Sequence, residues 1–79
     1  MFDPGSAAIA LGLTVRDARA RRRLSLRALG DRIGVSPSLV SQIERGQIRP
    51  SLTTLVALAV ELDLSLDATF GLRSGASIP

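Results

Sequence analysis

The chain has 79 residues, a length that fits one domain of modest stability, because such a domain buries only about 60% of its unfolded surface. It has no cysteine and no histidine, which removes disulfides, thiolate metal sites and the commonest catalytic base, so we expect no enzyme, metal or cofactor. No apolar run approaches the roughly 18 residues of a membrane span, and the N-terminus lacks the basic segment of a signal peptide, which indicates a cytoplasmic protein without a membrane partner.

The first helix is predicted from about Ala8, after an N-terminal arm at residues 1–7. Gly12 weakens this helix by up to about 1 kcal/mol relative to alanine. Arg21-Arg22-Arg23 ends it, where cations suit the helix macrodipole and a phosphate contact is the alternative. The residues that recur on one helical face are Ala8, Leu11, Val15, Ala18 and the stem of Arg22.

Two short helices joined by a tight turn are predicted next. Ser25 begins the first as its N-cap, and Gly34 suits its end, because glycine takes a positive φ without a Cβ penalty. Ser36 then offers its oxygen to the free N–H groups of the second helix, and Pro37 occupies the first position, where a missing N–H costs nothing. This helix runs to about Arg45, and the pair forms a helix-turn-helix.

The two faces of these helices differ in character. Gly30 indicates close packing between the helices. The inner face consists of Leu26, Leu29, Ile33, Val40 and Ile43, with Val35 beside them. The outer face of the second helix consists of Ser38, Leu39, Ser41 and Gln42. Packing in the core does not account for these outward-facing residues, so the face indicates a binding partner.

Two further helices are predicted after this unit. Ser51 caps the fourth helix, from Leu52 to Leu62, and Ser65 caps the fifth, which extends to Phe70. Val56, Ala57 and Val60 make the fourth helix apolar nearly all round, which is unusual for a surface helix in a small monomer. Its core side is predicted to be Leu52, Leu55, Leu58, Ala59 and Leu62. Residues 72–79 are predicted to be a tail or linker.

Positive charge is concentrated on the predicted helix-turn-helix. The chain carries a formal net charge of +3, but residues 16–49 contain nine arginines against three acidic residues, a net of +6. The remaining residues contribute one arginine against four acidic residues, a net of −3. A basic segment at this place suits a polyanionic partner, and a solvated arginine face is the alternative.

The chain resembles the helix-turn-helix regulators of the lambda-repressor/Cro (Xre) class from about Leu11 to Phe70. The matching segments are Leu24-Ser25-Leu26, Leu29, Ile33-Gly34-Val35-Ser36, Ser41-Gln42-Ile43-Glu44-Arg45-Gly46 and Arg49-Pro50-Ser51. The resemblance implies an all-α, five-helix lambda-repressor-like domain at residues 8–71, with the helix-turn-helix at its second and third helices. It further implies sequence-specific binding of double-stranded DNA as a transcriptional regulator, with residues 37–45 as the recognition helix in the major groove and repression as the favoured mode.

The resemblance also implies roles for individual residues. A buried ion pair is expected between Arg19 and Glu44, and glycine is usual where Arg23 stands, so a left-handed backbone there would be strained. By the resemblance, Pro37, Ser38 and Gln42 match positions that contact bases, and Gln42 is the leading candidate because glutamine can pair with adenine. From their own chemistry, Ser41 can donate to a base and Leu39 can touch a thymine methyl group. Because they flank the predicted recognition helix, Ser36, Arg45 and Arg49 are expected to contact phosphates, with ordinary solvated charge as the alternative for the two arginines. The start of the preceding helix is expected to do the same, at Ser25, Leu26 and Arg27.

The resemblance implies a homodimer on a palindromic operator, with the protein on the nucleoid when bound. The apolar residues available for a dimer or for a missing partner domain are Val56, Val60, Leu66 and Phe70. One alternative is a protein-interaction or antitoxin-type module on the same fold. Another is the isolated DNA-binding part of a larger ligand-sensing regulator with a C-terminal sensor domain.

Overall fold

The computed structural model describes residues 4–65, which form four α-helices and no strand within that range. They are α1 (Pro4–Arg21), α2 (Leu26–Ile33), α3 (Pro37–Glu44) and α4 (Leu52–Leu62). The all-α class is therefore confirmed, while the predicted fifth helix to Phe70 and the tail at 72–79 lie outside the described residues. None of the described helices is both long and apolar enough to cross a membrane.

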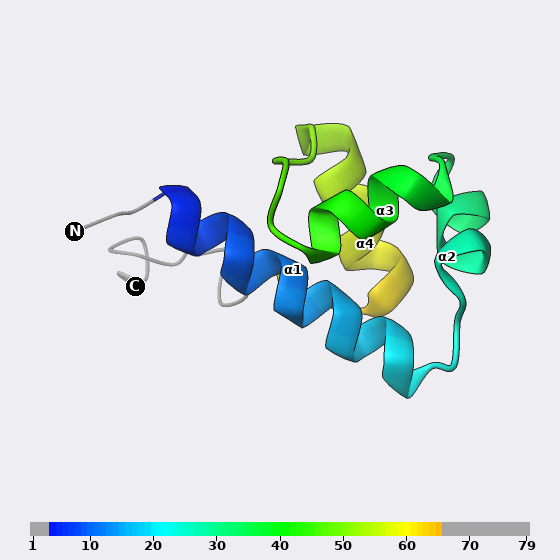
Figure 1. The fold of residues 1–79 in the computed structure, drawn as a ribbon. Coiled ribbons are helices and arrows are strands. Elements are labelled where there is room, and N and C mark those ends of the chain that lie inside the picture. The colour runs from blue at the N-terminus through cyan, green and yellow to red at the C-terminus, as the bar shows by residue number, and fades with distance from the viewer. Residues whose placement is uncertain (1–3, 66–79) are drawn as a thin grey trace, which may run out of the picture.

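The first helix starts earlier than the sequence predicts. It begins at Pro4 rather than Ala8, so residues 4–7 of the predicted arm are helical. Proline is tolerated at the first helical position, and the alanines that follow have high helix propensity. The prediction relied on the apolar face, which this first turn lacks because Gly5, Ser6 and Ala7 are exposed. As a result the N-terminal turns of α1 project past the other three helices (Figure 1).

The core lies between all four helices, because α3 packs against both α1 and α2 and α4 contacts both of them as well (Figure 1). Leu52, predicted to be in the core, is instead 73% exposed, because it shares the outer face of α4 with Val56 and Val60 at four-residue spacing. Arg22 is also exposed rather than packed along the core face. The buried apolar side chains are Leu11, Val15, Ala18, Leu29, Val40, Ile43, Leu58, Ala59 and Leu62.

Serine N-caps begin three of the four helices. The side-chain oxygen of Ser25 accepts a hydrogen bond from the Ala28 N–H at 2.9 Å. Those of Ser36 and Ser51 accept from the N–H groups three residues onward, at 3.0 Å and 3.2 Å. Each cap bonds one of the N–H groups that a helix start leaves free. These three predicted caps are confirmed, and they fix where α2, α3 and α4 begin.

Two glycines have distinct roles in the fold: one ends α2, and the other allows α1 to pack closely on α3. Gly34 ends α2 in the left-handed region, with φ 79°. Gly12 lies in α1 directly against the end of α3, where an added Cβ would be 2.4 Å from the Glu44 carbonyl oxygen and 2.6 Å from that of Ile43. Gly12 therefore offsets its low helix propensity by allowing α1 to approach the backbone of α3.

Candidate nucleic-acid interface

The outward face of α3 is polar along its whole length. Ser38, Gln42 and Arg45 recur at three- to four-residue spacing, so they share the face opposite buried Val40 and Ile43. Ser38 is exposed, Gln42 is half-buried and Arg45 is exposed. A helix with such a face, held by caps and packed on its other side, presents hydrogen-bonding groups to a partner.

The predicted base-contacting residues differ in exposure. Pro37 and Ser38 are exposed at the start of α3, whereas Ser41 and Gln42 are half-buried. The prediction that Leu39 faces outward is wrong in part, because its side chain is half-buried and packs against the hydrophobic core. It directly precedes fully buried Val40, which places it at the edge of the inner face.

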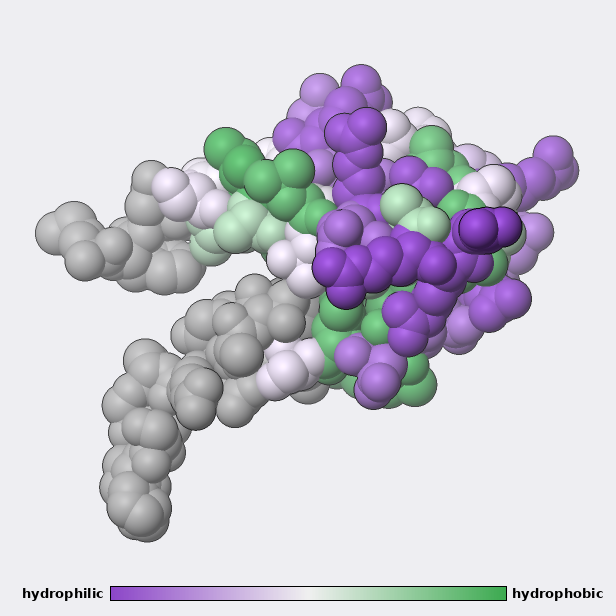
Figure 2. Space-filling model, turned by 90° about the horizontal axis from the view of Figure 1, so that it is seen from below, coloured by the Kyte–Doolittle hydropathy of each residue, from purple (hydrophilic) through white to green (hydrophobic). Residues whose placement is uncertain are grey.

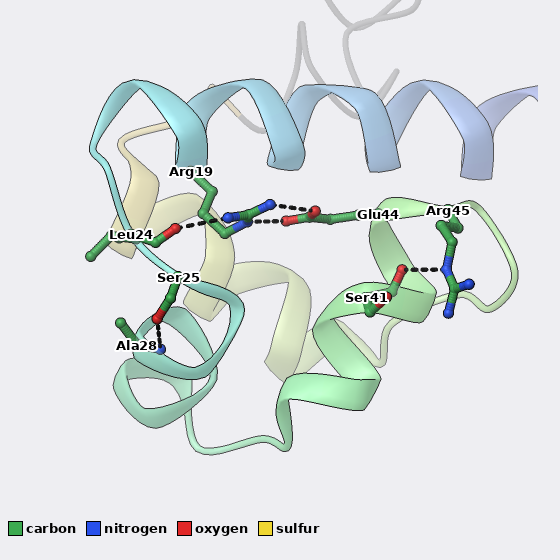
Figure 3. A network of polar contacts seen from close by, with 7 residues as sticks. All are labelled: Arg19, Leu24, Ser25, Ala28, Ser41, Glu44 and Arg45. Atoms are coloured by element: carbon green, nitrogen blue, oxygen red, sulfur yellow. Dashed lines mark hydrogen bonds and ion pairs between the residues drawn. The ribbon is translucent and has the colours of Figure 1, made fainter.

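The predicted phosphate-contacting residues lie at the ends of the two helices. Arg27 in the first turn of α2 is exposed. Leu26 is half-buried, and because its side chain is apolar, its backbone N–H is the group that can contact a phosphate. After α3, Arg45 and Arg49 are exposed, and Nε of Arg45 donates to the Ser41 carbonyl oxygen at 3.4 Å (Figure 3). The two helix N-caps, Ser25 and Ser36, are also exposed.

A buried ion pair connects α1 to the end of α3. Nε and Nη2 of Arg19 donate to the two carboxylate oxygens of Glu44, at 2.6 Å and 3.0 Å, so the pair predicted from the resemblance is present (Figure 3). Nη1 of Arg19 donates to the Leu24 carbonyl oxygen at 2.8 Å, a contact that the sequence did not predict. The hydrogen bond to Glu44 raises the pKa of Arg19. One guanidinium thus connects α1, the turn before α2 and the end of α3.

Most arginines of the domain have no carboxylate partner among the described residues. Arg19 pairs with Glu44, Arg21 pairs with Asp17, and Arg32 pairs with Glu61. The exposed arginines that form no ion pair within residues 4–65 are Arg16, Arg22, Arg23, Arg27, Arg45 and Arg49. Their positive charge is therefore available to an anionic partner.

Hydrophobic surface is exposed at several places on the described residues. Seen from below, it lies beside the projecting end of α1 and again along the lower edge of the molecule, while hydrophilic side chains cover most of the opposite end (Figure 2). Ile9 and Leu13 on α1 are 55% and 58% exposed. Within residues 4–65, no group of three acidic side chains is arranged to hold a metal ion.

The capped α2 and α3, the tight turn at Gly34 and the polar outer face of α3 define a helix-turn-helix domain. Residues 15–68 match the helix-turn-helix protein family, and the chain belongs to that family. Its resemblance to the lambda-repressor/Cro class is thereby confirmed.

Curated relatives are longer than this chain. An uncharacterized HTH-type transcriptional regulator of Sinorhizobium fredii, y4dL, is 44% identical over 52 residues, which cover 66% of this chain and 26% of the relative. An uncharacterized HTH-type transcriptional regulator of Mycobacterium tuberculosis, Rv0474, is 36% identical over 64 residues, which cover 81% of this chain and 45% of the relative. The chain thus spans between about a quarter and just under half of these relatives.

Two solved structures share the fold. The restriction-modification controller protein C.AhdI from Aeromonas hydrophila superposes with a TM-score of 0.74 at 31% identity, and the match covers 82% of this chain and 98% of that protein. The clp gene regulator ClgR from Corynebacterium glutamicum superposes with a TM-score of 0.74 at 30% identity, covering 89% of this chain and 74% of that one. Both neighbours are named as regulators or controllers.

Proposed function

We propose that this chain binds double-stranded DNA in a sequence-specific manner and regulates transcription, with repression as the favoured mode. The observation that carries the proposal is the polar outer face of α3, flanked by exposed arginines without ion-pair partners in the described part of the chain. A helix of this kind fits the major groove, and arginines beside it can contact phosphates. The names of relatives in two bacteria support the same activity. The binding unit would comprise the predicted domain at residues 8–71.

Within α3, Gln42 is the proposed base reader. Its side-chain amide can donate to adenine N7 and accept from adenine N6, and it shares the outer face of the helix with Ser38. Ser41 can add a hydrogen bond, while Pro37 and the accessible part of Leu39 can touch a thymine methyl group. Base recognition would therefore be concentrated in the first half and middle of α3.

Phosphate contacts would position this helix on the duplex. Arg45 and Arg49 lie beyond the end of α3, and Arg27 lies in the first turn of α2. The free N–H groups at the starts of α2 and α3, near Leu26 and Ser36, also suit an anion. Contacts on both sides of α3 would fix its orientation in the groove without adding sequence preference.

Binding of duplex DNA with a steep salt dependence tests this function against a protein-interaction module. The operator is first selected from a random pool of duplexes, and its dissociation constant is then measured over a range of salt concentrations. We expect a negative slope of log affinity against log salt of about 0.9 for each phosphate contacted. A protein that retains no duplex from the pool and shows no salt-dependent affinity would contradict the proposal.

A homodimer on a palindromic operator is proposed from the outer face of α4. Leu52, Val56 and Val60 recur at four-residue spacing and are 73%, 41% and 76% exposed. Three large apolar side chains in one stripe are unfavourable in water, and a second copy of the chain would cover them. Val56 and Val60 belong to the predicted surface, Leu52 extends it, and Leu66 and Phe70 lie outside the described residues.

A second candidate is that this domain is the DNA-binding part of a larger ligand-sensing regulator. The observation in its favour is that the chain spans 26% and 45% of two curated relatives. A C-terminal sensor domain would change what controls DNA binding and leave the role of α3 unchanged. In either form the protein would act in the cytoplasm, on the nucleoid when bound.

A further inference from the structure

The end of α1 forces one arginine into a left-handed backbone. The Leu24 N–H donates to the Arg19 carbonyl oxygen at 3.1 Å, and the Arg23 N–H donates to that of Ala20 at 3.0 Å. This pair of bonds is the Schellman arrangement of a helix end, which requires a left-handed residue at the position of Arg23. Arg23 has φ 54°, where a residue with a Cβ is strained and glycine is not.

The turn around Arg23 has little freedom to relax. Besides the backbone bonds, the Arg19 guanidinium donates to the Leu24 carbonyl oxygen at 2.8 Å while it pairs with Glu44 (Figure 3). The turn is therefore attached both to α1 and to the end of α3. Asp63 ends α4 with a similar φ of 55°, so the strain at Arg23 raises the question of a function and the exposed side chain has to answer it.

The side chain of Arg23 is well placed for an anion. It is exposed and forms no ion pair within the described residues, whereas nearby Arg21 pairs with Asp17 at 3.0 Å. Arg23 lies two residues before Ser25, the N-cap of α2, where phosphate contacts are proposed. A guanidinium on a long side chain can hold a phosphate through two hydrogen bonds.

We infer that Arg23 contacts a DNA phosphate and extends the protein–DNA interface from the start of α2 onto the end of α1. The inference rests on the proposed function. The competing explanation is that Arg23 acts only within the fold, through the favourable interaction of a cation with the C-terminal end of a helix. The two explanations differ in their effect on DNA binding, which Arg23→Gly measures directly because glycine relieves the strain and removes the charge together.

The experiment uses the full chain and a random-sequence duplex of about 30 base pairs, three helical turns. The dissociation constant is measured over a range of salt concentrations, below the melting temperature of every variant. We expect Arg23→Gly to weaken binding about three- to tenfold at low salt and to make the salt slope shallower by about 0.9. Its melting temperature should be equal to or above that of the wild type. Arg23→Lys, which keeps the charge, should retain the wild-type slope.

Arg21→Ala is the matched control, because it removes the same charge from an arginine that is already paired with Asp17. We expect the wild-type slope for this variant. An Arg23→Gly protein with wild-type affinity and slope would overturn the inference, and so would an equal change of slope in Arg21→Ala, which would mean that net charge alone matters. A wild-type protein that binds neither this duplex nor any duplex selected from a random pool would overturn the proposed function, whereas wild-type binding that Arg23→Gly leaves unchanged would overturn the inference alone.

Discussion

Replacing Glu44 by alanine tests how the domain holds α3 in place. The substitution removes two hydrogen bonds from the Arg19 guanidinium, with lengths of 2.6 Å and 3.0 Å. The Arg19 side chain is only 18% exposed, so its charge would be left largely out of water with the Leu24 carbonyl as its remaining partner. The hydrogen bond to Glu44 raises the pKa of Arg19, so the guanidinium is charged at neutral pH, and the stability that its raised pKa contributes is lost as the pH rises into strong alkali.

The expected cost is large relative to the stability of the domain. Removing one partner of a buried ion pair costs about 3–5 kcal/mol. We expect the lower value of about 3 kcal/mol, because Arg19 keeps the bond to Leu24 and some contact with water. A chain of this length has a total stability of roughly 4–12 kcal/mol. The melting temperature should therefore fall by about 12–24 °C.

Thermal unfolding followed by circular dichroism measures this fall. Glu61→Ala is the matched control, because Glu61 also pairs with an arginine, Arg32, at 3.0 Å, but their side chains are 29% and 53% exposed. An exposed pair of this kind contributes at most about 1 kcal/mol. If Glu44→Ala melted within about 2 °C of the wild type, the pair would have no role in holding α3 and the reasoning would be refuted.

Two further predictions concern close packing and self-association. Gly12→Ala should lower the free energy of unfolding by about 1–3 kcal/mol in chemical denaturation, because the new Cβ would lie 2.4 Å from the Glu44 carbonyl oxygen. A variant as stable as the wild type would contradict the close approach of α1 to α3. The double substitution Val56→Ser and Val60→Ser should shift the sedimentation coefficient toward that of the monomer at high protein concentration, since both side chains are exposed on α4. A wild-type protein that stays monomeric both free and on DNA would contradict the proposed dimer.

The sequence was most informative about local features. A serine before each of α2, α3 and α4 marks their starts, because the N-cap bond joins residues only three positions apart. Positive φ at Gly34 follows from the same local geometry. The Arg19–Glu44 pair joins residues far apart in the chain, and it was expected only through the family resemblance.

The sequence was least informative where contacts between helices decide which residues are buried and how large a residue fits at a position. The sequence predicts that Gly12 weakens α1, and only the position of α3 shows that no larger residue fits there. The sequence predicts Leu52 on the core side of the fourth helix, but on α4 its side chain shares the outer face with Val56 and Val60. The sequence predicts Leu39 on the outer face of α3, yet it lies at the edge of the core.

The central claim is that α3 recognises bases through Gln42 while Arg45 contacts phosphate. The most direct test compares Gln42→Ala with Arg45→Ala on the selected operator and on random-sequence duplex. Gln42→Ala should cost about 1–3 kcal/mol on the operator and little on random DNA, because base contacts carry the sequence preference. Arg45→Ala should weaken binding to both and make the salt slope shallower by about one unit. Equal weakening of operator and random binding by Gln42→Ala would contradict the account, since it would show that Gln42 does not contact base edges.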